Sequence, residues 1–113
     1  TINSFLALKV VFFNELKSVF DNLNLNNDWS NFVSSLSRDK RIGDSHMSVP
    51  GPDGRHGYGG PCFPKDVNAL IHLCGELDIP ARTLLGAWMT NLNVRPEQDW
   101  KELKGRAVVD GES

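Results

Sequence analysis

The first 23 residues carry an apolar helical pattern that limits which folds the chain can adopt. Apolar side chains between Ile2 and Leu23 occur in nearly every direction around a helix, so the predicted helix must be buried on most of its faces. A domain of 113 residues buries only about two-thirds of the surface of its unfolded chain. We therefore expect a neighbouring surface, outside this chain, to cover part of the helix.

The same helix is a poor candidate for a membrane span. About 22 residues would cross a bilayer, but polar and charged side chains at that depth carry a large free-energy cost. The interrupting residues are Asn3, Lys9, Asn14, Glu15 and Lys17. A secretory signal is also disfavoured, because the sequence has no positive N-terminal segment and no small-residue cleavage site.

Charge and cysteine content narrow the function classes further. A net charge of −2 without any basic run argues against nucleic acid as a partner. The histidines His46, His56 and His72 form no zinc-binding spacing with the cysteines, so we predict no metal site. One of the two cysteines is expected to act as a thiol, which favours a reducing compartment, and we expect a cytoplasmic location.

The remaining pattern predicts a small all-α domain with one long loop. Apolar periodicity predicts helices over residues 2–23, 29–36, 63–77 and from Pro80 to about 93. Asp28 or Asn27 is expected to cap the second helix. The polar stretch 38–61, with its glycines and prolines, predicts a loop. Because the first and fourth helices carry more apolar surface than so small a unit can cover, we expect a homodimer through them.

Cys62 lies in the run GYGGPCFPKD, residues 57–66. Glycines upstream remove side chains that would keep a ligand off the backbone, and Pro64 is preset for the first turn of a helix. The thiol is therefore expected at a helix N-terminus, where free N–H groups and Lys65 favour the nucleophilic thiolate. An isolated cysteine can also be a small buried apolar residue, and we interpret Cys74 in this way because leucines and an isoleucine surround it.

This motif and two upstream stretches resemble a known protein family. Together with DKRIG at 39–43, NSFLA at 3–7 and the pair Asn14 and Glu15, the cysteine run resembles the central domain of the UDP-glucose/GDP-mannose dehydrogenases. The resemblance covers residues 1–95 and implies a helical central and dimerisation domain, with a fold like the C-terminal domain of 6-phosphogluconate dehydrogenase. Enzymes of this family use NAD to oxidise C6 of a nucleotide-linked hexose twice, from alcohol to carboxylate.

The resemblance implies a chemical role for Cys62, Asp66, Asn3 and Lys65. Cys62 would add to the C6 aldehyde, and loss of a second hydride from the thiohemiacetal would leave a thioester for water to cleave. Asp66, one helical turn further on, would orient or deprotonate that water, and Asn3 would hold the water and the developing oxyanion. Lys65 would approach the dinucleotide. Without the cysteine motif, Asp66 and Lys65 would be ordinary residues of a first helical turn.

The loop before the cysteine is the predicted substrate segment. By the resemblance, Arg41 would reach across a dimer interface to the substrate of the neighbouring subunit, and later loop residues would contact the nucleotide sugar. These residues are His46, Met47, Ser48, Val49, Pro50, Tyr58, Gly59 and Gly60. The loop departs from the family pattern, because His46 and Met47 replace an expected tyrosine and the insert 51–56 is longer than usual. Both departures leave the identity of the sugar open.

Two parts of the family's machinery have no counterpart in the sequence. No hydrophobic strand leads into a glycine-rich turn and a helix, so NAD would be bound by a domain absent from this chain. The family also places a catalytic lysine four residues before the position of Asn3, which falls before Thr1.

Two interpretations of function therefore stay open. In the first, the chain is a central-domain fragment of an NAD-dependent nucleotide-sugar 6-dehydrogenase of the UDP-glucose to UDP-glucuronate type, and it is inactive alone. In the second, it is a non-catalytic helical dimerisation module with a vestigial cysteine motif. Residues 96–113 are either a tail or the start of a C-terminal nucleotide-sugar-binding domain. If these residues begin a C-terminal domain, the first strand of that domain would cover residues 105–109.

Overall fold

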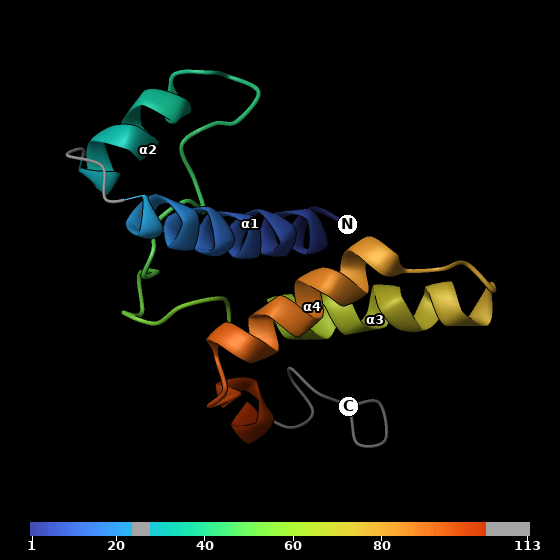
Figure 1. Ribbon diagram of the computed structural model, residues 1–113. Helices are drawn as coiled ribbons and strands as arrows, with labels where there is room; N and C mark the ends of the chain where they lie inside the picture. Colours follow the sequence, from blue (N-terminus) through green and yellow to red (C-terminus); the bar gives the residue numbers. More distant parts are fainter. Residues whose placement is uncertain (24–27, 104–113) are drawn as a thin grey trace.

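Helices make up all the regular structure that is described. The computed structural model describes residues 1–23 and 28–103. Its elements are α1 (Ile2–Asn22), α2 (Trp29–Ser37), α3 (Phe63–Glu76), α4 (Arg82–Val94) and the short 3₁₀ helix η1 (Asp99–Leu103) (Figure 1). Within these described residues no strand occurs, which confirms the predicted all-α fold.

The helix boundaries follow local chemistry, with one shift from the prediction. Asp28 caps α2, because its Oδ1 accepts a hydrogen bond from the N–H of Ser30 at 3.0 Å. The fourth helix begins at Arg82, two residues after Pro80. Its N-cap residue, Ala81, has φ −93° and ψ 51°, which lies outside the helical region and delays the first turn.

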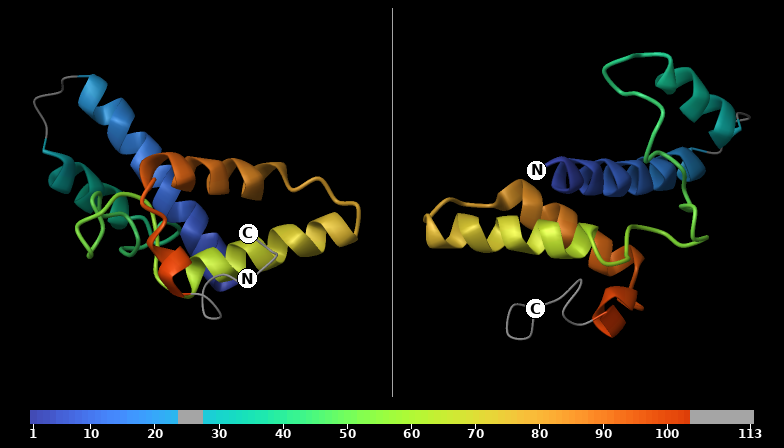
Figure 2. Two further views of the ribbon diagram at one scale, coloured as in Figure 1. Left: turned by 90° about the horizontal axis from the view of Figure 1, so that it is seen from below. Right: turned by 180° about the vertical axis from the view of Figure 1, so that it is seen from behind.

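α1 packs against both members of a helical hairpin formed by α3 and α4 (Figure 2). Ala7 and Val11 of α1 meet Tyr58 and Val67 in the core that joins the three helices. At the other end of α1 a second core joins Phe13 to the loop that follows α2 and to α2 itself. The loop between α2 and α3 thus runs from one core to the other and carries most of the predicted site residues.

One face of α1 remains exposed. Ile2, Phe5, Phe12, Val19 and Leu23 are each between 54 and 75% exposed. Their successive spacings of three, seven, seven and four residues place them at the a and d positions of one heptad pattern, the positions through which helices pair. We call these five residues the α1 stripe. The expectation that a partner covers this helix stays a prediction, now with a defined surface.

Beyond α4 the chain folds back onto the helices. Trp100 of η1 is 1% exposed, and its ring centre lies 5.3 Å from that of Trp88. The domain boundary predicted at residue 95 remains a prediction. The strand predicted over residues 105–109 and the alternative cap Asn27 lie outside the described residues. None of the helices within 1–23 and 28–103 has the length and apolar content that a membrane span requires.

Candidate active site

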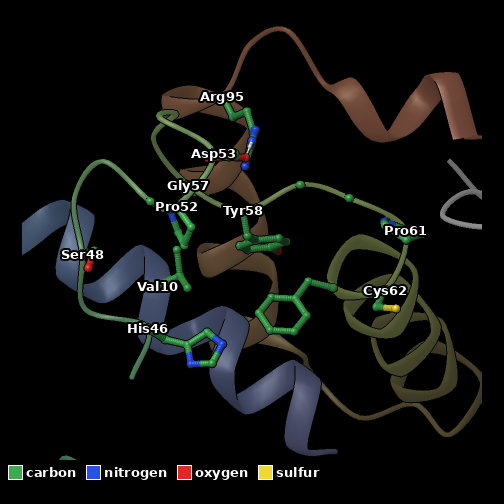
Figure 3. Close-up of a pocket in the computed structure, with 14 residues that line it drawn as sticks. Val10, His46, Ser48, Pro52, Asp53, Gly57, Tyr58, Pro61, Cys62 and Arg95 are labelled. Carbon is green, nitrogen blue, oxygen red and sulfur yellow. Dashed lines mark hydrogen bonds and ion pairs between the residues drawn. The ribbon is translucent and has the colours of Figure 1, made fainter. Parts of the chain in front are cut away.

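A cavity of about 500 Å³ lies between α1, the long loop and the start of α3 (Figure 3). Its wall includes Val10 of α1, loop residues between 46 and 61, and Cys62 and Phe63 at the start of α3. Arg95, just after α4, also lines the cavity. The cavity is large enough for a sugar-sized ligand, and a cysteine thiol lies at its edge.

Cys62 is the N-cap residue of α3 and is exposed. Pro64 occupies the first turn of this helix, as the sequence predicts. The backbone N–H of Asp66 donates to the carbonyl of Cys62 at 2.9 Å, which closes the first helical turn. The thiol is therefore presented at a helix N-terminus and stays accessible to a reactant.

Asn3 and Asp66, 63 positions apart in the sequence, are in direct contact. The side-chain amide Nδ2 of Asn3 donates a hydrogen bond to Oδ2 of Asp66 at 2.8 Å. The contact joins α1 to the first turn of α3, one turn from Cys62. The fold thus gathers all three residues predicted to be catalytic at one place, while their roles stay predictions.

The predicted substrate segment divides between the cavity and the core. His46, Ser48, Tyr58, Gly59 and Gly60 line the cavity. Burial alternates along this part of the loop, where His46 and Ser48 are exposed and the residue after each of them is buried. These are Met47 and Val49, which are 3% and 7% exposed and pack beside Phe13.

The other predicted contacts lie away from this cavity. Pro50 lines a separate hollow of about 470 Å³ beside α2. Arg41 is exposed and pairs with its neighbour Asp39 at 2.7 Å. Hydrogen bonds from the Arg41 side chain and backbone hold the pKa of Asp39 below its ordinary value. Lys65 is exposed on the first turn of α3 and does not line the cavity.

Three polar side chains from other elements hold the glycine run in place. The N–H of Gly57 donates to Oδ1 of Asn14 at 3.1 Å. Tyr58 is held twice by Asn91: its N–H donates to Oδ1 at 2.8 Å, and its carbonyl accepts from Nδ2 at 3.0 Å. The N–H of Gly60 donates to Oδ2 of Asp99 at 3.3 Å.

These contacts change the explanation for two glycines. A Cβ at Gly57 would lie 2.4 Å from Oδ1 of Asn91, and a Cβ at Gly59 would lie 2.5 Å from both carboxylate oxygens of Asp99. The sequence suggested that the glycines make room for a ligand. In the structure, side chains of the protein itself occupy the room at these two positions.

Sequence reasoning missed Asn91 and Asp99 as site residues, and it used Asn14 only as part of the family pattern. A signal for Asn91 exists in the sequence. Asn91 follows Leu84 and Trp88 at helical spacing, on the same side of α4, where an apolar residue would be expected. A polar residue at such a position needs hydrogen-bond partners when it is buried. No comparable signal marks Asp99, because its partner Gly60 lies 39 positions away.

Aromatic rings form another part of the cavity wall. The ring of His46 stacks on Phe63 with centres 5.7 Å apart, and Tyr58 meets Phe63 edge-on at 6.0 Å. The backbone of His46 has φ 61°, in the left-handed region that non-glycine residues rarely adopt. Burial raises the pKa of Tyr58 above its ordinary value, so its hydroxyl stays protonated and neutral.

The second cysteine differs from its predicted setting. Cys74 is half-buried, whereas the sequence placed it in the core. The reason is that the C-terminal half of α3 extends past the core, so Leu73 and Leu77 are 47% and 59% exposed. Within residues 1–23 and 28–103, no three His, Cys, Asp or Glu side chains are grouped closely enough to hold a metal ion.

Comparisons with known proteins found a matching family and several relatives. Residues 1–93 match the family model described as "UDP-glucose/GDP-mannose dehydrogenase family, central domain". The chain is 32% identical over 107 residues to a UDP-glucose 6-dehydrogenase of Rhizobium meliloti, covering 95% of this chain and 22% of that protein. It is 36% identical over 76 residues to UDP-glucose 6-dehydrogenase YwqF of Bacillus subtilis, covering 67% of this chain and 16% of the relative.

A third relative is a UDP-glucose 6-dehydrogenase of Rickettsia bellii, 41% identical over 68 residues that make up 60% of this chain and 14% of that protein. In each case the matched stretch is less than a quarter of the relative's length. No solved structure matches the chain significantly.

Proposed function

Because the chain belongs to the UDP-glucose/GDP-mannose dehydrogenase family, matching its central domain, we propose that it is the central domain of an NAD-dependent nucleotide-sugar 6-dehydrogenase. The proposed reaction is the oxidation of UDP-glucose at C6 to UDP-glucuronate, in keeping with the names of its relatives. The observation that carries the proposal is the hydrogen bond from Asn3 to Asp66, one helical turn from the exposed thiol of Cys62.

Cys62 supplies the nucleophile. Its thiolate forms a C–S bond to the C6 aldehyde carbon, and the aldehyde oxygen takes up a proton to complete a thiohemiacetal. After the second oxidation the sugar is bound to Sγ as a thioester. Attack by water then breaks the C–S bond, releases the carboxylate and returns the thiolate. The position of Cys62 suits this role, because the residue is exposed and lines the cavity.

Asn3 and Asp66 act on the water and on the developing charge. An amide nitrogen has two hydrogens, and Asn3 uses one to orient the Asp66 carboxylate. The other is free to donate to the oxyanion that forms at C6. Asp66 accepts a proton from the attacking water, a role for which a carboxylate held in one orientation is well suited.

Among the described residues, no strand leads into a glycine-rich turn and a helix, the arrangement that commonly binds a dinucleotide. NAD, which accepts a hydride in each of the two oxidations, would be bound by another domain of a longer protein. Of this chain, only Lys65 is proposed to approach the dinucleotide, from the exposed face of the first turn of α3.

Variants in a longer chain that includes an upstream dinucleotide-binding domain test the proposal. Cys62→Ser should stop turnover before the carboxylate, whereas Asp66→Asn should slow hydrolysis and let a sugar adduct on Cys62 accumulate in intact-mass spectra. Cys74→Ser is the matched control and should keep full turnover. Full turnover by Cys62→Ser, or NAD reduction by the 113-residue chain alone, would contradict the assignment.

We also propose that the domain forms a homodimer through the α1 stripe. An a and d pattern on one long helix fits a second copy of itself, because identical stripes are self-complementary about a two-fold axis. Met89 of α4, which is 67% exposed, would extend the interface. Phe12→Asp should convert a dimer to a monomer in light scattering, while Asn22→Asp at the end of the same helix should not. A wild-type monomer at tens of micromolar would remove the dimer proposal.

A further inference from the structure

Arg95 carries a buried positive charge that the proposed chemistry does not use. Its side chain is 1% exposed although it follows directly after α4. Nη2 hydrogen-bonds to Oδ2 of Asp53, and Nε lies 3.0 Å from Oδ1 of Asp99. The second contact is an ion pair without hydrogen-bond geometry, since neither of its two atoms makes a hydrogen bond. A buried arginine is tolerated only when carboxylates pair with it, and these two account for its burial.

Asp53 belongs to a segment that lines the cavity, whereas Asp99 holds a residue of the cavity wall, Gly60, from outside. Asp53 lies in a tight turn over residues 51–55, closed by the N–H of Gly51 donating to the carbonyl of Arg55 at 2.9 Å. We call residues 51–55 the strap; its residues 51–53 line the cavity (Figure 3). Asp99, in η1, accepts the hydrogen bond from Gly60, two residues before Cys62. Arg95 thus connects a wall of the cavity with the turn that leads to the thiol.

Further charges support the same connection. Arg55 of the strap lies 3.8 Å from Asp99 and 4.0 Å from Glu97. Burial acts to raise the pKa of Asp53, but hydrogen bonds from Arg95 and from the Arg55 backbone outweigh it, and the pKa is lowered. Asp53 is therefore ionised at neutral pH and available to pair. The strap makes up most of the insert 51–56 that departs from the family pattern, and this pairing attaches it to the rest of the domain.

We propose that Arg95 is a positioning residue that holds the strap through Asp53 and the Gly59–Gly60 turn through Asp99, and so sets the shape of the cavity beside Cys62. Its catalytic meaning rests on the proposed function. The attachment of the strap and of the Gly59–Gly60 turn can be measured in the 113-residue chain without any enzymatic activity. The positioning role of Arg95 and the proposed function can therefore fail separately.

Hydrogen exchange of backbone amides, followed by mass spectrometry, tests the connection. Asp53→Asn should speed exchange in the strap about tenfold or more, because a charge-assisted hydrogen bond becomes a neutral one or is lost. Asp99→Asn should do the same at residues 59–60. Exchange in α1 should change less than twofold in both variants. Asp21→Asn, which removes an exposed ion pair at 2.7 Å from Lys17, is the matched control and should leave both segments unchanged.

A conservative change separates geometry from charge alone. Arg95→Lys keeps the charge but lacks the planar fork that pairs with two carboxylates. Amide exchange should therefore stay slow in one of the two segments, the strap or residues 59–60, and become faster in the other. In a longer, active dehydrogenase, Asp99→Asn should lower kcat at least tenfold and change KM less than threefold. Unchanged exchange in both aspartate variants would overturn the proposal, as would faster exchange at 59–60 with an unchanged kcat. An inactive parent enzyme would instead overturn the proposed function, and the exchange data would still decide this inference.

Discussion

Replacing Asn91 with alanine should unfold the chain more easily and release the glycine run that leads to Cys62. Asn91 is fully buried, at 0% exposure, and its amide forms two hydrogen bonds with the backbone of Tyr58. Tyr58 is itself buried, so water cannot readily replace the amide. Alanine would leave one N–H and one carbonyl of the backbone without partners in the interior.

The size of the effect follows from these two groups. Each buried polar group left without a partner costs about 1–3 kcal/mol, so the pair costs about 2–6 kcal/mol. Alanine offsets a few tenths of a kcal/mol of this loss in the free energy of unfolding, because it is a better helix former than asparagine. We expect a net loss of about 3 kcal/mol in the free energy of unfolding. For a domain of this size that corresponds to a melting temperature lowered by about 12–20 °C.

Urea unfolding followed by circular dichroism measures the loss, with Asn93→Ala as the matched control. Asn93 lies two residues further along α4 and is exposed, so the same substitution there should change the free energy of unfolding by less than about 0.5 kcal/mol. Amide exchange at Tyr58 should rise only in the Asn91 variant. Equal stability of the two variants would refute the reasoning that Asn91 holds the glycine run.

Three further predictions concern the same site. Gly57→Ala should cost about 2 kcal/mol or more in urea unfolding, because φ is 68° and its Cβ would meet Asn91; Gly75→Ala in α3, with open space around it, should be neutral or stabilising. Iodoacetamide should label the exposed Cys62 faster than the half-buried Cys74 in peptide maps, and the reverse order would count against a nucleophile. The lowered pKa of Asp53 means that its link contributes stability above about pH 4 and loses it as pH falls through the folded-state pKa. The stability difference between wild type and Asp53→Asn should therefore shrink in acid, and a constant difference from pH 6 to 2 would argue against the link.

Local sequence patterns were enough to predict the helices. Pro64 and Asp28 mark two of the helix starts because capping and first-turn preferences depend on a few neighbouring residues. The start of the fourth helix was placed two residues early, because Pro80 is compatible with a first turn but does not enforce one. Cys74 was assigned to the core because periodicity locates an apolar face without saying how far along the helix a neighbour covers it.

The sequence by itself determined an all-α domain and a cysteine at a helix N-terminus, and its family resemblance grouped Asn3, Asp66 and Cys62 as predicted catalytic residues. Only the tertiary structure decided that Asn3 contacts Asp66 and that Asn91 and Asp99 hold the glycine run. It also decided that Met47 and Val49 belong to the core, on either side of Ser48, which lines the cavity. The physical reason is range. Caps and periodicity act over a few residues, whereas each of these contacts joins positions more than 30 residues apart, which local propensity does not encode.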